Sequence, residues 1–251
     1  MKPDRTRYDL LSAGDKNTKL RKGADSDYVT NGLSFAPGSI SGFNVCSSAS
    51  TGCLAACLHT AGNGRYPNVE AGRIRRTQLF FTDRPLFLSY LRSDLEKSRQ
   101  RAASLGKRLA IRLNVISDIQ YERFFPGLFE EFSDCQFYDY TKHALRMRRF
   151  CAGELPDNYH LTFSRSENNW RACVGLLFLG ANVASVFEVD RMPARHHGFE
   201  VIDGDRTDLR FLEGKRGQIV GLKAKGMARG DTSGFVVHHT ESAHSLLDSL
   251  A

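Results

Sequence analysis

Short apolar runs of β type alternate with stretches of helical periodicity, and this alternation constrains the fold more than any other feature of the sequence. The pattern is typical of parallel strand–helix–strand units, in which each strand is followed by a helix that packs back on the sheet. The ranges expected as strands are 41–45, 109–115, 136–140, 159–164, 182–187, 199–202 and 218–223.

The segments between these strands carry the start signals of helices. Pro67 fits the first turn of a helix over 68–81, and Asp83 is placed to cap the helix that follows. A basic helix is also expected over 142–151, and a further helix over 167–179. The chain is therefore expected to be an α/β protein.

Two α/β architectures fit this element order: a full or partial parallel βα barrel of TIM-like form, and an open doubly wound sheet. We favour the barrel because polar residues follow several strands in succession. Residues 1–32 are charged and without clear periodicity, and they are expected to form a polar N-terminal arm. Residues 33–251 are expected to form a single barrel-like domain, for which this length is normal.

Three of the six cysteines lie within twelve residues, at Cys46, Cys53 and Cys57. The first residues form no apolar leader, so we expect a cytoplasmic protein whose thiols stay reduced. Thiolates at short loop spacing suit iron–sulfur clusters and zinc. We favour a [4Fe–4S] cluster on which the three sulfurs converge and which leaves one iron open. The alternatives are a zinc site completed by His59 and three plain buried cysteines.

Small polar and charged residues follow five of the expected strands. The carboxyl ends of parallel strands meet at one edge of a sheet, so these residues are expected to surround a pocket for a small polar or phosphorylated ligand. Helix caps and tight turns are the local alternative, and Asp203, Asp205 and Asp208 holding a hard cation is another. The candidate catalytic residues are Asn114, Asp118, Asp139, Lys142, Ser164, Glu167, Asp203, Asp205 and Lys225.

The formal net charge is +7, from 35 basic and 28 acidic residues. Arginines gather at 73–76 and at 146–149, as either a phosphate-binding patch or two solvated helix faces. Nucleic acid is therefore a second expected partner.

Ser–His–Asp and Walker-type signals are absent, which gives no support to a hydrolase or a nucleotide triphosphatase. No apolar run approaches the roughly 20 residues of a membrane helix, so no membrane association is expected.

Several segments resemble the phage and plasmid gene product 88 family, and the resemblance covers about residues 30–237. They include CSSASTGCLAACLHTAGNGRYPNV, RLNVISDIQYE, FYDYTK, LPDNYHLTFSRSE, VIDGDRTDLRF and GLKAKGMARGDTSGFV.

More loosely, the cysteine segment is similar to that of radical S-adenosylmethionine enzymes. Those enzymes place three cluster-binding cysteines on the loop after the first strand of a partial βα barrel. Their usual spacing is Cys-x3-Cys-x2-Cys, whereas the spacing here is Cys-x6-Cys-x3-Cys. This resemblance implies an iron–sulfur enzyme with S-adenosylmethionine as a further cofactor. The alternative is a nucleic-acid-binding accessory protein with a structural zinc or iron–sulfur site.

Overall fold

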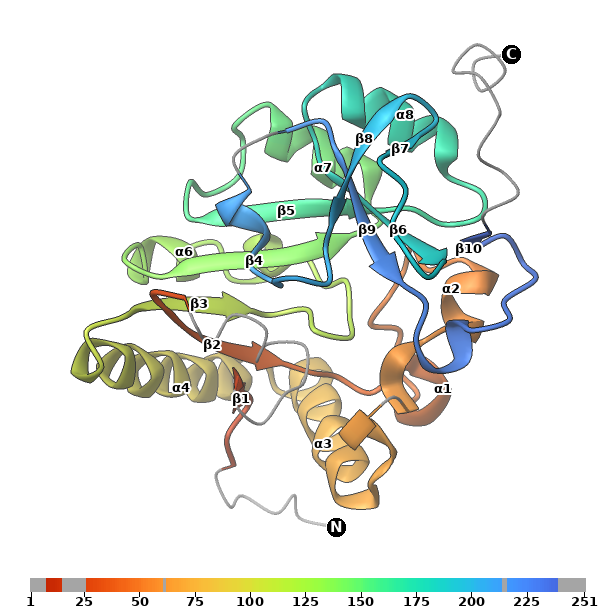
Figure 1. Ribbon diagram of the computed structural model, residues 1–251. Helices are drawn as coiled ribbons and strands as arrows, with labels where there is room; N and C mark the ends of the chain where they lie inside the picture. The colour runs from red at the N-terminus through yellow and green to blue at the C-terminus, as the bar shows by residue number, and fades with distance from the viewer. Residues whose placement is uncertain (1–7, 15–25, 61, 214–215, 239–251) are drawn as a thin grey trace.

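The structure, a computed structural model, describes residues 8–14, 26–60, 62–213 and 216–238. A ten-stranded, mostly parallel sheet runs through the molecule in the order β1-β2-β3-β4-β5-β6-β9-β8-β7, and β10 pairs with β6 (Figure 1). The strands are β1 (Leu11–Ala13), β2 (Tyr28–Leu33), β3 (Arg108–Arg112), β4 (Gln136–Thr141), β5 (Tyr159–Ser164), β6 (Val183–Glu188), β7 (Arg195–His196), β8 (Phe199–Asp203), β9 (Ile219–Lys223) and β10 (Val236–His238).

Helices lie between consecutive strands from β2 to β6 and cover the outer face of the sheet, with α3 and α4 beside β2 and β3, and α7 and α8 beside β5 and β6 (Figure 1). The α-helices are α1 (Gly38–Ser41), α2 (Thr51–Ala55), α3 (Pro67–Thr82), α4 (Arg84–Ser104), α5 (Tyr121–Phe124), α6 (Leu128–Glu131), α7 (Ala144–Cys151) and α8 (Trp170–Phe178). Short 3-10 turns lie at Leu58–Thr60, Gly62–Arg65, Arg210–Leu212 and Gly226–Ala228.

The sheet is curved but open. Neighbouring strands from β2 through β6, and onward through β9 and β8, are parallel, whereas β1 with β2 and β7 with β8 are antiparallel. The edge strands β1 and β7 lie at opposite ends of the strand order, and no pairing between them closes the sheet within the described residues. The expectation of a mostly parallel α/β sheet is confirmed, but a closed barrel is not formed.

The N-terminal part of the chain corrects two expectations. Residues 1–32 are not simply an arm, because β1 and β2 belong to the sheet and β2 pairs with β3 from Tyr28 to Gly32. The segment 41–45 is not a strand: Ser41 is the last residue of α1, and Gly42, with φ of 78°, turns the chain there. A glycine in the left-handed conformation commonly ends a helix, and its backbone at this position is not that of the strand expected over 41–45. The cysteines therefore follow β2, with α1 between.

The helix start signals predicted the two long helices. Pro67 is the first residue of α3, and the Asp83 carboxylate accepts a 3.0 Å hydrogen bond from the backbone N–H of Leu86 at the start of α4. A cap of this kind stabilises a helix by about 1 kcal/mol. The predictions of β4 and β5 are also confirmed.

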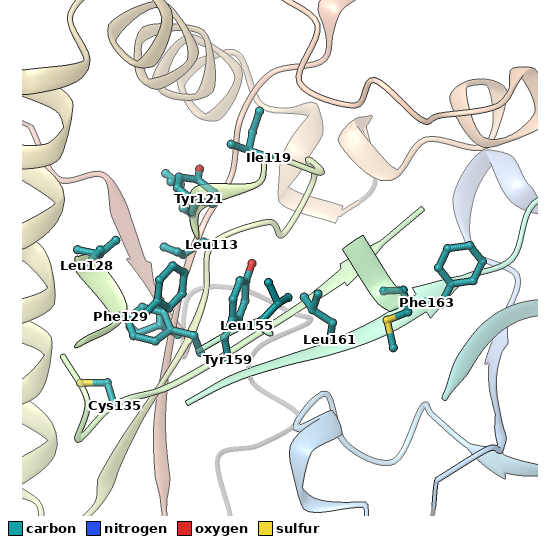
Figure 2. Packing of buried hydrophobic residues seen from close by; sticks show 14 of the residues in the cluster. Leu113, Ile119, Tyr121, Leu128, Phe129, Cys135, Leu155, Tyr159, Leu161 and Phe163 are labelled. Atoms are coloured by element: carbon teal, nitrogen blue, oxygen red, sulfur yellow. The ribbon is translucent and has the colours of Figure 1, made fainter. Parts of the chain in front are cut away.

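The main core lies between the outer face of the sheet and the helices. Figure 2 shows Phe129 and Tyr159 packed together there, with ring centroids 4.6 Å apart. Phe80 and Phe87 are fully buried on the α3–α4 side of the same core. Each such ring contributes roughly 1.5–3 kcal/mol through burial, so this core holds the helices on the sheet.

A second, smaller cluster covers part of the inner, concave face. It is formed by Tyr28, Ala110, Tyr138 and Leu209, with Phe211 packed against it. Leu209 and Phe211 come from the segment between β8 and β9, which therefore lies across the inside of the curve. Space for a ligand is left at the carboxyl ends of the strands. No helix in the described ranges is both long and apolar enough to cross a membrane.

Candidate functional site

A cavity of about 1300 Å³ opens at the carboxyl ends of the parallel strands and extends to β1 and α4. In Figure 1 the arrows of β2 to β5 point toward the side on which α1, α2 and the cysteine segment lie. Of the residues expected at the site, Asp139, Glu167 and Asp203 do not line the cavity. Those that do line it are Cys46, Cys53, Cys57, Asn114, Asp118, Lys142, Ser164, Asp205 and Lys225.

Glu167 lies outside the cavity and ties the cysteine segment to the sheet. Its carboxylate accepts a 2.6 Å hydrogen bond from the Ser50 hydroxyl and a 2.8 Å hydrogen bond from the backbone N–H of Gly52. Burial raises the pKa of Glu167, but these two hydrogen bonds bring the pKa below its ordinary value. Glu167 is therefore a charged anchor for the first turn of α2 and not a lining residue.

Gly52 allows α2 to lie close to two other segments. A Cβ at this position would lie 2.3 Å from the Ser233 Oγ and 2.8 Å from the Phe235 Cβ. Both distances are shorter than van der Waals contact, so a side chain at position 52 would push α2 away. Glycine here fixes the position of Cys53, which follows it directly.

The three cysteines share the cavity but not a common centre. The pKa of Cys46 is raised to about 12, first by burial, then by Asp118, then by the two other thiols, Cys53 and Cys57. They are thus close enough to influence one another electrostatically. Among the described residues, however, no three Cys, His, Asp or Glu side chains gather as ligands of one ion. The expected convergence of the three sulfurs on one centre is therefore not found.

The local structure of the cysteine segment separates Cys53 from Cys57 and leaves His59 outside the cavity. Cys53 lies within α2, but Cys57 lies beyond its last residue, and its backbone N–H donates to the Leu54 carbonyl. The two cysteines are therefore not carried on one helical face. His59, the expected fourth zinc ligand, does not line the cavity, although its carbonyl accepts a 2.6 Å hydrogen bond from Arg73.

Asp139 is fully buried behind the cavity wall. Its carboxylate accepts hydrogen bonds from the Asn114 backbone N–H (2.7 Å), the Asn114 side-chain amide (2.9 Å) and the Tyr159 hydroxyl (2.7 Å). Burial raises the pKa of Asp139 to about 6, although the Tyr159 hydroxyl and Arg146 act in the opposite direction. The carboxylate holds the loop after β3 in place, so Asp139 supports the cavity wall from behind.

Asp118 and Arg146 form a second buried connection. The Asp118 carboxylate accepts hydrogen bonds from the Lys142 backbone N–H at 2.7 Å and from Arg146 Nη1 at 3.3 Å. The Arg146 guanidinium is fully buried and also binds both oxygens of Glu122. Arg146 therefore belongs neither to a solvated helix face nor to a phosphate-binding patch. The nucleic-acid alternative loses one of the arginines on which it depended.

The lysines at the rim differ in their partners. The Lys225 ammonium pairs with the Asp205 carboxylate. The Lys142 ammonium lies 5.7 Å from the ring centroid of Phe235 and has no ion pair with a carboxylate among the described residues. Lys142 also lowers the pKa of Cys46, so its charge acts on the cysteine side of the cavity.

The three aspartates near β8 do not form a cation site. Asp205 pairs with Lys225, Asp208 accepts hydrogen bonds from Arg112, and the Asp203 carboxylate accepts a 2.9 Å hydrogen bond from the backbone N–H of Asp205. Their oxygens are directed at separate donors, so the hard-cation alternative has no support within the described residues.

Arg112 is a cavity-lining residue that the sequence reasoning missed. Its Nη1 donates to both oxygens of Asp208, at 2.9 and 2.8 Å, and its guanidinium lies 4.5 Å from the Tyr140 ring centroid. The one available signal was an arginine in the middle of the mostly apolar run LAIRLNV.

The fold and site together define an open, curved, mostly parallel α/β protein with a cavity at its strand ends that is lined by cysteines and charged residues. The family model described as Gene product 88 matches residues 9–239, and the chain belongs to that family. No curated protein and no solved structure matches the chain.

Proposed function

We propose that this protein binds an iron–sulfur cluster through Cys46, Cys53 and Cys57 and acts on a small anionic ligand bound in the adjoining cavity. The observation that carries the proposal is that all three cysteines of the segment line one large cavity at the strand ends. In parallel α/β proteins this edge of the sheet is where ligands bind.

The donor set fits a cluster of this kind in its chemistry. Thiolates are the usual ligands of [4Fe–4S] clusters, and three of them leave one iron without a protein ligand. The described thiols would have to rotate toward one another to bind it, since they do not gather as ligands. A bound cluster would supply redox chemistry and an open iron beside the ligand, and S-adenosylmethionine is to be tested separately as a further cofactor.

The charge of the cavity favours an anionic ligand. Its lining includes nine arginine and lysine residues against five aspartates, Asp9, Asp94, Asp118, Asp205 and Asp208, which leaves an excess of positive charge. Such an excess attracts phosphates and carboxylates. The basic residues are Arg65, Arg73, Arg76, Lys97, Arg101, Arg112, Lys142, Lys223 and Lys225.

The test is purification without oxygen, followed by absorption spectroscopy and assays of iron, acid-labile sulfide and zinc. The proposal expects a broad absorption band in the visible range and about four iron atoms per chain. Cys46→Ala, Cys53→Ala and Cys57→Ala should each lose the iron, whereas the control Cys151→Ala, which lies on α7 away from the cavity, should keep it. Zinc without iron, or iron that survives all three substitutions, would overturn the proposal.

A further inference from the structure

Arg112 combines deep burial with incomplete hydrogen bonding. Its residue exposure is 6%, and it is the last residue of β3. Asp208 binds its Nη1 only, and the buried Nε has no hydrogen-bond partner among the described residues. A buried donor without a partner is unfavourable because it has lost its hydrogen bonds to water, so such a donor calls for an explanation.

The surroundings of Arg112 hold its guanidinium in one place. Asp208 fixes one nitrogen, and the Asp208 carboxylate also accepts a 3.3 Å hydrogen bond from the Tyr138 hydroxyl. The Tyr140 ring packs against the guanidinium plane. The charge of Asp208 raises the pKa of Arg112 further above its ordinary value, against the effect of burial, so the side chain stays cationic. The result is a rigid cation in the cavity lining.

We propose that Arg112 is an anion-binding subsite of the cavity, which binds a carboxylate or phosphate group of the ligand through the Nε–Nη2 edge of its guanidinium. That edge is the pair of parallel N–H donors that matches two oxygens of a carboxylate or phosphate. Asp208 leaves it unused because it binds the other nitrogen. The inference rests on the ligand half of the proposed function and does not depend on the cluster.

The test is calorimetric titration of inorganic phosphate, and separately of malonate, into the full-length protein at constant ionic strength. Binding by the wild type is expected to weaken by about ten- to a hundredfold in Arg112→Lys, which keeps the charge but loses the planar pair of donors. The double variant Arg112→Met/Asp208→Asn should show the same loss without leaving a buried carboxylate unpaired. The matched control is Arg108→Met, at the exposed opposite end of the same strand, which should bind as the wild type does.

Tighter binding of one probe than the other identifies the acidic group that the subsite prefers. Failure of the wild type to bind either probe, or unchanged binding of both by Arg112→Lys and the double variant, would overturn the inference. Iron content measured on the same samples separates the two proposals. Arg112-dependent binding by protein that contains no iron would support the subsite and contradict the cluster. Bound iron without Arg112-dependent binding would support the cluster and contradict the subsite.

Discussion

The carboxylate of Glu167, in the loop after β5, accepts a 2.8 Å hydrogen bond from the backbone N–H of Gly52, in the first turn of the helix that carries Cys53. Residues 115 positions apart in the chain are thereby fixed to one another. A charged anchor between the sheet and the cysteine segment determines where at least one thiol meets the cavity.

Glu167→Ala is therefore expected to loosen the cysteine segment without unfolding the protein. Two hydrogen bonds to a charged group are lost, and a hydrogen bond of this kind contributes about 1.5–3 kcal/mol to the free energy of unfolding. The rate at which a thiol reagent modifies the cysteines should rise, and any bound iron should fall. The control is Glu154→Ala, which removes an exposed carboxylate paired with Arg149. Equal thiol reactivity in the two variants would show that Glu167 does not position the segment.

Gly52→Ala tests the same contact by steric means. The new methyl group would lie 2.3 Å from the Ser233 Oγ, which can rotate away, and 2.8 Å from the Phe235 Cβ, which cannot withdraw without moving its backbone. Overpacking of this kind destabilises a protein by about 1–3 kcal/mol, measured as the free energy of unfolding in denaturant. Gly127→Ala is the matched control, because a Cβ there meets no atom within 4 Å. A Gly52→Ala variant as stable as that control would contradict the packing described here.

The buried carboxyl of Asp139 predicts a pH dependence of stability. Its folded-state pKa of about 6 is above the ordinary value of 3.8, so between these values the folded state holds a proton that the unfolded state has released. The contribution of Asp139 to the free energy of unfolding is therefore greatest at low pH and decreases as pH rises through about 6.

Asp139→Asn removes this titration and is the comparison that isolates it. The difference in unfolding free energy between wild type and variant, measured from pH 4 to pH 7, should shift against the wild type as pH rises. A difference that stays constant, or shifts toward the wild type, would show that Asp139 is ionised in the folded protein throughout this range.

Local signals explain why part of the fold could be predicted from the sequence. The long helices have Pro67 and Asp83 at their starts, and β5 alternates apolar with polar residues, so these elements could be predicted without tertiary information. Strand β2 was missed because its sequence, YVTNGL, contains Asn31 and Gly32. These residues disfavour a strand in isolation, but Asn31 donates a 2.7 Å hydrogen bond to Ser98 on α4, a contact formed only in the folded chain.

The candidate site was predictable to the extent that it depends on strand ends. That rule brought Asn114, Lys142, Ser164 and Lys225 to one cavity. The same rule wrongly predicted that Asp139 lines the cavity. Alternate residues of β4 face opposite sides of the sheet, and Asp139 lies on the same side as the buried Phe137. Arg112 was missed because its role depends on Asp208, 96 positions away, which no local pattern connects to it.

Lys225→Ala separates a ligand contact from a structural one. The Lys225 side chain is 51% exposed and pairs with Asp205, so its loss should change the free energy of unfolding by no more than about 1 kcal/mol. Its charge lies at the cavity rim, where it attracts an anion through partly screened solvent. We therefore expect phosphate and malonate to bind several-fold more weakly, a smaller loss than in Arg112→Lys, with the thermal transition unchanged.

The control is Arg148→Ala, an exposed cation on α7 outside the cavity. Wild-type affinity in Lys225→Ala would place the ligand deeper than the rim, and unfolding of the variant would show that the Lys225–Asp205 pair is structural.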